Sequence, residues 1–251
     1  MRRVSRPELL DSDLLESQEL AAALADLRWV NRWCGGIGTT LDMVAHVARR
    51  LRSSTLSLLD VAAGSGDVPS AIQRILASRG VRVEVTLFDR RRTHLPTNAN
   101  PAQFPLPPNH GLKSRCVAGD ALALPFGDAS FDLVTCALFA HHLEPAELVR
   151  FVGEALRVAR TAVLINDLQR SVLSWALVYA GYPLFHSAVA WRDGLVSVRR
   201  AYTPQELRAL LARSPAAHIE LRKHYLFRMG AIAWKNGAWS SLRMQYRYGK
   251  R

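Results

Sequence analysis

Apolar residues in the central part of the chain form short runs rich in leucine and β-branched residues, separated by amphipathic stretches. Five runs predict strands at residues 57–62, 81–88, 114–118, 130–138 and 159–165. Apolar positions three and four residues apart predict helices between them, including 68–76 and 145–155. Alternation of strands and helices indicates an α/β fold of the doubly wound, Rossmann-like kind, with a mostly parallel sheet.

The patterns divide the chain into four predicted segments. These are an N-terminal helical cap at 1–52, a core at 53–168, a helical lid at 169–200, and the end of the core sheet with a basic tail at 201–251. Helical patterns at 8–26 (continuing to 33) and at 41–51 make up the cap. Two further apolar runs, 219–227 and 231–234, bring the predicted sheet to seven strands.

The predicted lid is unusual because its first part, residues 171–185, is apolar nearly all round. A helix without a polar face is normally buried, lies in a membrane interface or lines an apolar cavity. Gly181 and Pro183 interrupt the run, which is too short to span a bilayer. A hydrophobic small-molecule acceptor is the partner that this segment favours.

Small and acidic residues follow the predicted strands at the point where each strand ends. The first strand contains Asp60 and runs into Gly64 and Gly66, the second ends at Asp89, and the third is followed by Asp120. Glycines at a strand-to-helix turn let the backbone approach a ligand, and the helix N-terminus offers N–H groups. An acidic residue after the next strand is placed to accept hydrogen bonds from ribose hydroxyls.

These motifs, in this order, resemble those of the class I S-adenosylmethionine-dependent methyltransferases over residues 55–170. The resemblance implies a seven-stranded sheet with an antiparallel last strand, and S-adenosylmethionine as the cofactor. The segments 166–170 and 200–204 look like the bacterial small-molecule branch near the ubiquinone and menaquinone methylases. Methyl transfer to an oxygen or carbon of a hydrophobic phenol, quinol or polyketide-like molecule is the implied reaction.

The resemblance also assigns cofactor-binding residues. They are Asp60, Ala62, Gly64 and Gly66 around the methionine part, Asp89 and Arg90 at the ribose, Gly119, Asp120 and Ala121 at the adenine, and Cys136 and Ala137 near the sulfonium. The family usually has glycine where this chain has Ala62. Alanine is tolerated in that turn if its φ is negative.

Two histidines at the end of the fourth predicted strand are the candidate catalytic residues. His142 is the first choice for a base or an acceptor-orienting group, and His141 is the second. The alternative is that they cap the helix that follows. The candidate substrate-binding residues are Asp167, Arg170, Tyr182, His186 and Arg192, with Asp167 and Arg170 expected to pair or to bind a polar group.

Composition limits the partners and the compartment. A net charge of +12 raises the question of nucleic acid or an anionic membrane surface. The arginines are dispersed, so nucleic acid is disfavoured, and peripheral membrane contact stays open along with a monomeric or homodimeric state. The three cysteines show no metal-ligand spacing. Sparse cysteines and the absence of a signal-peptide pattern favour the cytoplasm.

Three other functions stay open at this point. An RNA methyltransferase would use the same core, but residues 136–140 lack the Asn/Asp-Pro-Pro-Tyr/Phe type of motif of amino-group methylases. A nicotinamide-dependent dehydrogenase would need a third glycine near Ser70. A cofactor-binding module without catalysis is the third, given Ala62 and the proline-rich loop expected at 96–108.

Overall fold

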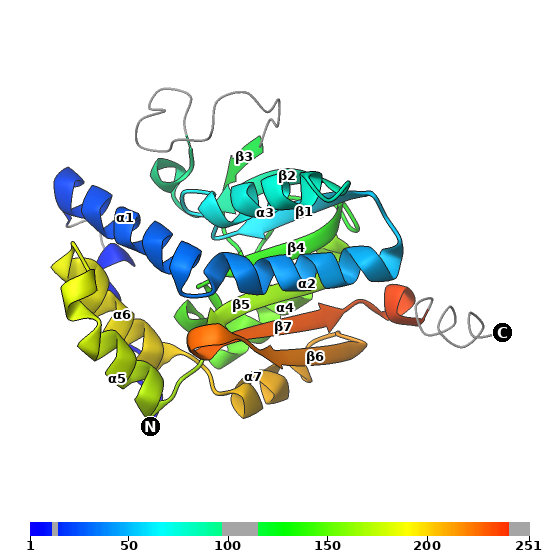
Figure 1. Cartoon of the computed structure of the whole chain (residues 1–251). Helices are drawn as coiled ribbons and strands as arrows, with labels where there is room; N and C mark the ends of the chain where they lie inside the picture. Colours follow the sequence, from blue (N-terminus) through cyan, green and yellow to red (C-terminus); the bar gives the residue numbers. More distant parts are fainter. Residues whose placement is uncertain (12–14, 97–114, 241–251) are drawn as a thin grey trace.

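The computed structural model describes residues 1–11, 15–96 and 115–240 of the chain. The expected proline-rich loop and the basic tail therefore lie almost entirely outside the described residues. One seven-stranded sheet forms the centre, with helices on both faces (Figure 1).

The sheet has the order β3-β2-β1-β4-β5-β7-β6. Its strands are β1 (Thr55–Val61), β2 (Arg82–Asp89), β3 (Arg115–Ala118), β4 (Phe131–Ala137), β5 (Ala159–Leu168), β6 (His218–Lys223) and β7 (Arg228–Trp234). All neighbours from β3 to β5 pair in parallel, and β7 is antiparallel to both β5 and β6. The predicted fold and its antiparallel last strand are confirmed.

The helices are α1 (Ser17–Trp33), α2 (Gly36–Leu51), α3 (Asp67–Ala77), α4 (Pro145–Val158), α5 (Val172–Ala180), α6 (Ala188–Arg200) and α7 (Pro204–Leu211). Short 3-10 turns are η1 (Leu9–Asp11), η2 (Arg92–His94), η3 (Ala140–His142), η4 (Tyr182–Leu184) and η5 (Tyr225–Phe227). None of the helices in the described ranges is long and apolar enough to cross a bilayer.

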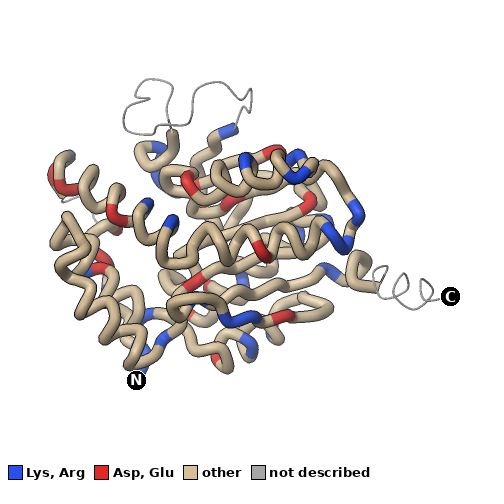
Figure 2. The backbone as a smooth tube through the Cα atoms, in the orientation of Figure 1, with Lys and Arg blue, Asp and Glu red and all other residues tan. Residues whose placement is uncertain are grey.

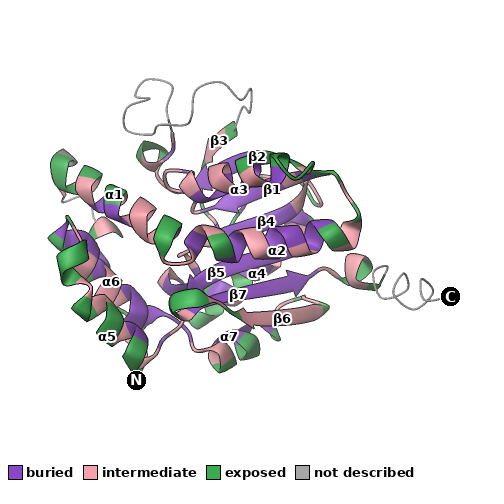
Figure 3. Cartoon of the chain, viewed as in Figure 1, coloured by how far each residue is buried: buried purple, intermediate pink, exposed green. Residues whose placement is uncertain are grey.

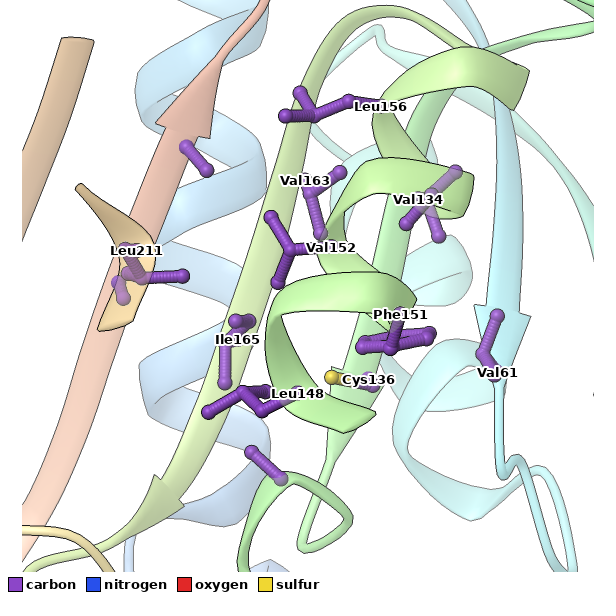
Figure 4. Close-up of a cluster of buried hydrophobic side chains, with 14 of the residues drawn as sticks. Val61, Val134, Cys136, Leu148, Phe151, Val152, Leu156, Val163, Ile165 and Leu211 are labelled. Carbon is purple, nitrogen blue, oxygen red and sulfur yellow. The ribbon is translucent and has the colours of Figure 1, made fainter. Parts of the chain in front are cut away.

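Two apolar layers hold the sheet between its helices. On one face, α4 buries Leu148, Phe151, Val152 and Leu156, which lie on one side of the helix because of their spacing (Figure 4). The other face packs against α2 and α3, and both layers are buried in the centre of Figure 3. α2 is therefore part of the core, although it belongs to the segment expected as a cap.

Helix ends follow local sequence signals. Glu144 and Glu147 form a reciprocal capping box at α4, and Thr203 does the same with Glu206 at α7. Several boundaries differ from the prediction. α1 begins at Ser17, α2 begins at Gly36, β7 begins at Arg228, and η5 replaces the end of the strand expected at 219–227. Leu226 and Phe227 have positive φ angles there, whereas residues in a regular β-strand have negative φ angles.

Helices α1, α5 and α6 lie together beyond one edge of the helix-covered core (Figure 1). In the view of Figure 2, Lys and Arg are scattered over many elements and are not gathered on one face. The arrangement leaves the carboxyl ends of the parallel strands facing these three helices, which is where the site lies.

Candidate functional site

A cavity of about 800 Å³ lies beyond the carboxyl ends of β1, β2 and β4. The order of the sheet reverses between β1 and β4, and ligands of open α/β sheets bind at such a switch point. The turns that follow β1, β2 and β4 make one end of the cavity, called the cofactor end below. Helices α1, α5 and α6, the 3-10 turn η3 and the N-terminal turn make the other end, called the acceptor end. One cavity therefore spans the cofactor motifs and the predicted lid.

The glycine turn is fixed at the cofactor end by Asp89, at the end of β2. Its carboxylate accepts hydrogen bonds from the backbone N–H groups of Gly64, at 2.9 Å, and Arg91, at 3.0 Å. Gly66 has φ +67°, and a Cβ atom on it would lie 2.7 Å from Leu87. The turn thus needs glycine at this position for both conformation and space.

Ala62 has a φ angle of +56°, so the condition under which alanine is tolerated in this turn, a negative φ, is not met. This left-handed conformation brings the Cβ atom close to the following carbonyl and costs an alanine about 1–2 kcal/mol. Ala62 nevertheless lines the cavity, as do Asp60 and Gly64. The turn keeps its shape at the expense of local strain.

Asp60 is the buried carboxylate of this turn, with 3% of its surface exposed. Thr135 donates a hydrogen bond of 2.6 Å to it from β4. Burial, aided by the charges of Asp67 and Asp89, raises the pKa of Asp60 to about 7. A positive charge in the cavity would favour the ionised form.

The remaining expected cofactor residues divide into two groups. Arg90, Gly119, Asp120, Ala121 and Ala137 line the cavity; of the expected residues in the turn, Asp60, Ala62 and Gly64 line it and Gly66 does not. Cys136 does not: it is 1% exposed and packs in the apolar layer under α4 (Figure 4), because side chains alternate along β4. Its assignment to the cofactor is corrected, and Ala137 and Leu138 take that place in the wall.

Arg228, which the sequence did not single out, is 1% exposed at the start of β7 and lies in the cavity wall. Its Nε donates to the Cys34 carbonyl at 3.2 Å, and its Nη2 lies 3.5 Å from the Asn31 side-chain oxygen. Among the described residues, its Nη1 has no hydrogen-bond partner. A buried guanidinium with an unused donor is suited to a carboxylate.

The acceptor end of the cavity contains a cluster of ionisable side chains. His141, on η3, is 2% exposed, and its Nδ1 lies 2.7 Å from Asp167 of β5. Its Nε2 lies 3.3 Å from Glu8, which precedes η1. Burial alone would lower the pKa of His141, but Asp167 and Glu8 together raise it to about 10.

His142 lies beside His141, with ring centroids 4.3 Å apart. Its Nδ1 is 3.1 Å from Asp11 and its Nε2 is 3.7 Å from Glu8. Both histidines line the cavity and therefore lie where a catalytic group is expected. Glu8, His141 and His142 could also hold a metal ion, since they offer ligand atoms within 4.8 Å of one another.

The expected substrate-binding set is largely not brought together. Asp167 does not pair with Arg170: it binds His141, whereas Arg170 contacts Glu206 and donates to the Ala201 carbonyl at 2.8 Å. Arg170 thus anchors the start of α7, and neither member of the expected pair lines the cavity.

The three lid candidates also point elsewhere. Tyr182 packs edge-on against Trp191, and the His186 side chain is 83% exposed beside Asp26. Arg192 is exposed on α6, and none of the three lines the cavity. The lid residues that line the cavity are instead mostly apolar from α5 to the start of α6 and more polar further along α6; they are Ser174, Leu177, Val178, Gly181, Leu184, Phe185, Ala190, Asp193, Gly194, Ser197 and Arg200.

Comparison with known proteins agrees with this geometry. Residues 58–162 match a family described as a methyltransferase domain. The chain is 29% identical over 176 residues to a demethylmenaquinone methyltransferase of Thermus thermophilus, covering 69% of this chain and 68% of the relative.

Two solved structures show the same fold. Magnesium protoporphyrin IX methyltransferase of Synechocystis, with bound SAH, has a TM-score of 0.55 at 12% identity, over 90% of this chain and 91% of that one. A SAM-dependent methyltransferase of Aquifex aeolicus has a TM-score of 0.51 at 16% identity, over 72% and 82%. At these identities the two structures show the shared fold, and the methyltransferase-domain match confirms the predicted enzyme class, whose methyl donor is S-adenosylmethionine.

The cavity fits that cofactor. The glycine turn permits close backbone approach, Asp89 and Asp120 stand at the ends of their strands, and Asp60 supplies a carboxylate near the turn. Each of these positions was predicted from the sequence, but their individual contacts with the cofactor stay predictions. Glu8 and Arg228 are additions from the structure.

Proposed function

We propose that this chain, a class I S-adenosylmethionine-dependent methyltransferase, transfers a methyl group to an oxygen or carbon atom of a hydrophobic small molecule. The cofactor supplies an electrophilic methyl group on a sulfonium. The chain's own residues hold that methyl and the acceptor in line, which contributes most of the rate in such reactions.

The observation that carries the proposal is the contrast inside one cavity. Its lid side is formed by apolar residues of α5 and η4, including Leu177, Val178 and Leu184. Glu8, His141 and His142 bring ionisable side chains to the same cavity, and Asp11, Asp193 and Arg200 line it beside them. An apolar acceptor with one polar group fits this arrangement, because few polar groups then fix its orientation.

The Thermus relative supports an apolar ring as the acceptor, since its name specifies demethylmenaquinone. We propose phenols and quinols as the acceptor class, with their polar group placed by His142 and His141. Nothing in the apolar wall favours an RNA acceptor, which would need cationic and stacking groups along a groove.

Two measurements test the proposal. Calorimetry with S-adenosylhomocysteine should show binding that weakens at least tenfold in Asp89→Ala, because the variant loses the carboxylate that holds the Gly64 turn. Transfer of labelled methyl groups to a series of phenols and quinols should favour those with larger apolar substituents. Absence of transfer to every member, with cofactor binding intact, would reject this acceptor class.

A further inference from the structure

The N-terminal segment, residues 3–11, crosses the acceptor end of the cavity and is held there by many hydrogen bonds. Arg3 donates to the Leu143 carbonyl at 2.9 Å and to the Arg200 carbonyl at 2.7 Å. The Val4 N–H donates to the Arg199 carbonyl at 3.1 Å. These bonds tie the segment to η3 and to the end of α6.

Glu8 is the residue that this segment brings into the site. It is 7% exposed, and its Oε1 accepts a hydrogen bond of 2.8 Å from Ser197. The next two backbone N–H groups, of Leu9 and Leu10, donate to the two carboxylate oxygens of Asp193, at 2.8 Å each. Glu8 is therefore fixed in position on both sides.

The two carboxylate oxygens of Glu8 have different surroundings. Oε1 faces Ser197 and His141, whereas Oε2 is 3.7 Å from His142 Nε2, which is longer than a hydrogen bond. Glu8 lines the cavity, so a ligand hydroxyl can reach this carboxylate. Oε2 is the oxygen with capacity for a further hydrogen bond.

The contacts of their polar atoms distinguish Glu8 from its neighbour His141. Both ring nitrogens of His141 face carboxylates, Nδ1 that of Asp167 at 2.7 Å and Nε2 that of Glu8 at 3.3 Å. Neither nitrogen is therefore placed to take a proton from a ligand hydroxyl. Asp167 has both oxygens engaged by His141 and backbone N–H groups.

We propose that Glu8 is the general base for a hydroxyl acceptor, with His141 and Asp167 fixing its position and charge. This inference rests on the proposed function. The acceptor oxygen forms a bond to the methyl carbon, the carbon–sulfur bond breaks with its electron pair going to sulfur, and the hydroxyl proton passes to Glu8 Oε2. The products are a methyl ether, the neutral thioether and a protonated Glu8, which releases its proton to water.

The first test needs no acceptor. Titration of His141 by NMR, in the wild type and in Glu8→Gln, reports whether Glu8 faces its ring. The charged or titratable groups around that ring are Asp167, Glu8, His142, Arg3, Asp11, Asp193 and Arg200. Loss of the Glu8 charge should lower the pKa of His141, while Glu19→Gln, an exposed carboxylate on α1, should leave it unchanged. An unshifted His141 in Glu8→Gln overturns the proposal.

The second test is kinetic. Glu8→Gln should lower kcat about 10²-fold or more at every pH, with unchanged affinity for S-adenosylhomocysteine, which also shows that the variant is folded. Formate should restore part of the rate to Glu8→Ala, because it supplies a carboxylate in the vacated space. Glu19→Gln is again the control.

Three outcomes overturn the proposal. A fully active Glu8→Gln with an inactive His142→Ala would make the histidine the base. A wild-type rate that is abolished by EDTA and restored by Zn²⁺ would make the cluster a metal site. Absence of transfer by the wild type itself would reject the proposed function as well, whereas the first two outcomes leave that function standing.

Discussion

Asp60 links the stability of the fold to pH, because its carboxyl group is buried beside the carboxylates of Asp67 and Asp89. Its pKa is raised from 3.8 to about 7 by burial and by the neighbouring charges of Asp67 and Asp89. Each pKa unit corresponds to about 1.4 kcal/mol, so ionised Asp60 destabilises the folded state by about 4 kcal/mol. A raised carboxyl pKa means that the unfolded chain loses this proton first, and stability falls as pH rises from about 4 to about 7.

Asp60→Asn removes the ionisation but keeps a side chain of the same shape that can accept the Thr135 hydrogen bond. The variant should therefore gain stability over the wild type by about 2 kcal/mol at pH 5 and about 4 kcal/mol at pH 8. Urea unfolding of both proteins without cofactor, at half-unit pH steps from 5 to 8, measures the difference. If the Asn side chain makes a weaker or stronger hydrogen bond to Thr135, the stability difference shifts by the same amount at every pH, and its change with pH is unaffected.

Asp132 provides a matched control on the neighbouring strand. Burial alone would raise its pKa, but hydrogen bonds from Ser57 and Arg160 lower it below the usual value of 3.8. Its contribution is therefore fully present above pH 5, and Asp132→Asn should differ from the wild type by an amount that does not change between pH 5 and pH 8. The reasoning is refuted if Asp60→Asn shows the same flat difference.

Three further predictions concern the turn, the cofactor and the core. Ala62→Gly should raise the free energy of unfolding by about 1 kcal/mol, because glycine adopts the positive φ without strain; a less stable variant in thermal unfolding would contradict the assigned conformation. Arg228→Met should weaken S-adenosylhomocysteine binding about ten- to a hundredfold, since a charged hydrogen bond is worth about 1.5–3 kcal/mol. A cofactor analogue without the carboxylate should bind both proteins equally in calorimetry, and an equal loss for both ligands would argue against this contact. Phe151→Ala should cost about 3–5 kcal/mol in urea unfolding, because the ring is fully buried under the sheet; a cost below about 1 kcal/mol would show that this layer tolerates the cavity.

The parts of the fold that the sequence predicted are those that depend on local pattern. Apolar runs predict the strands from β1 to β5, and Gly64 and Gly66 predict the glycine turn. The parallel arrangement of these strands then places their carboxyl ends on the same side of the sheet. The positive φ angle of Ala62 could not be predicted from the sequence, because alanine adopts such an angle only when the surrounding turn imposes it.

The lid and the acceptor end show where local pattern fails. An apolar helix such as α5 has no polar face, so its sequence does not tell which side lines a cavity and which side carries Tyr179 outward. Glu8 lies 133 positions before His141, and only the folded chain brings the two together. Its one sequence signal was its position at the start of a segment predicted to be a helix, which also contains Glu16 and Glu19.

The two ends of the cavity therefore come from different parts of the chain, and this separation has a consequence for specificity. The cofactor end is built from the carboxyl ends of β1, β2 and β4, which the sheet holds rigidly. Segments outside those strands build the acceptor end: the N-terminal segment with Glu8, η3 with the two histidines, the helices α1, α5 and α6, and η5 before β7. Substitutions in the lid wall, for example at Leu177, should change which acceptor is methylated while leaving cofactor affinity unchanged. A lid variant that lost acceptor selectivity and cofactor affinity together would show instead that the two ends of the cavity fold and bind as one unit.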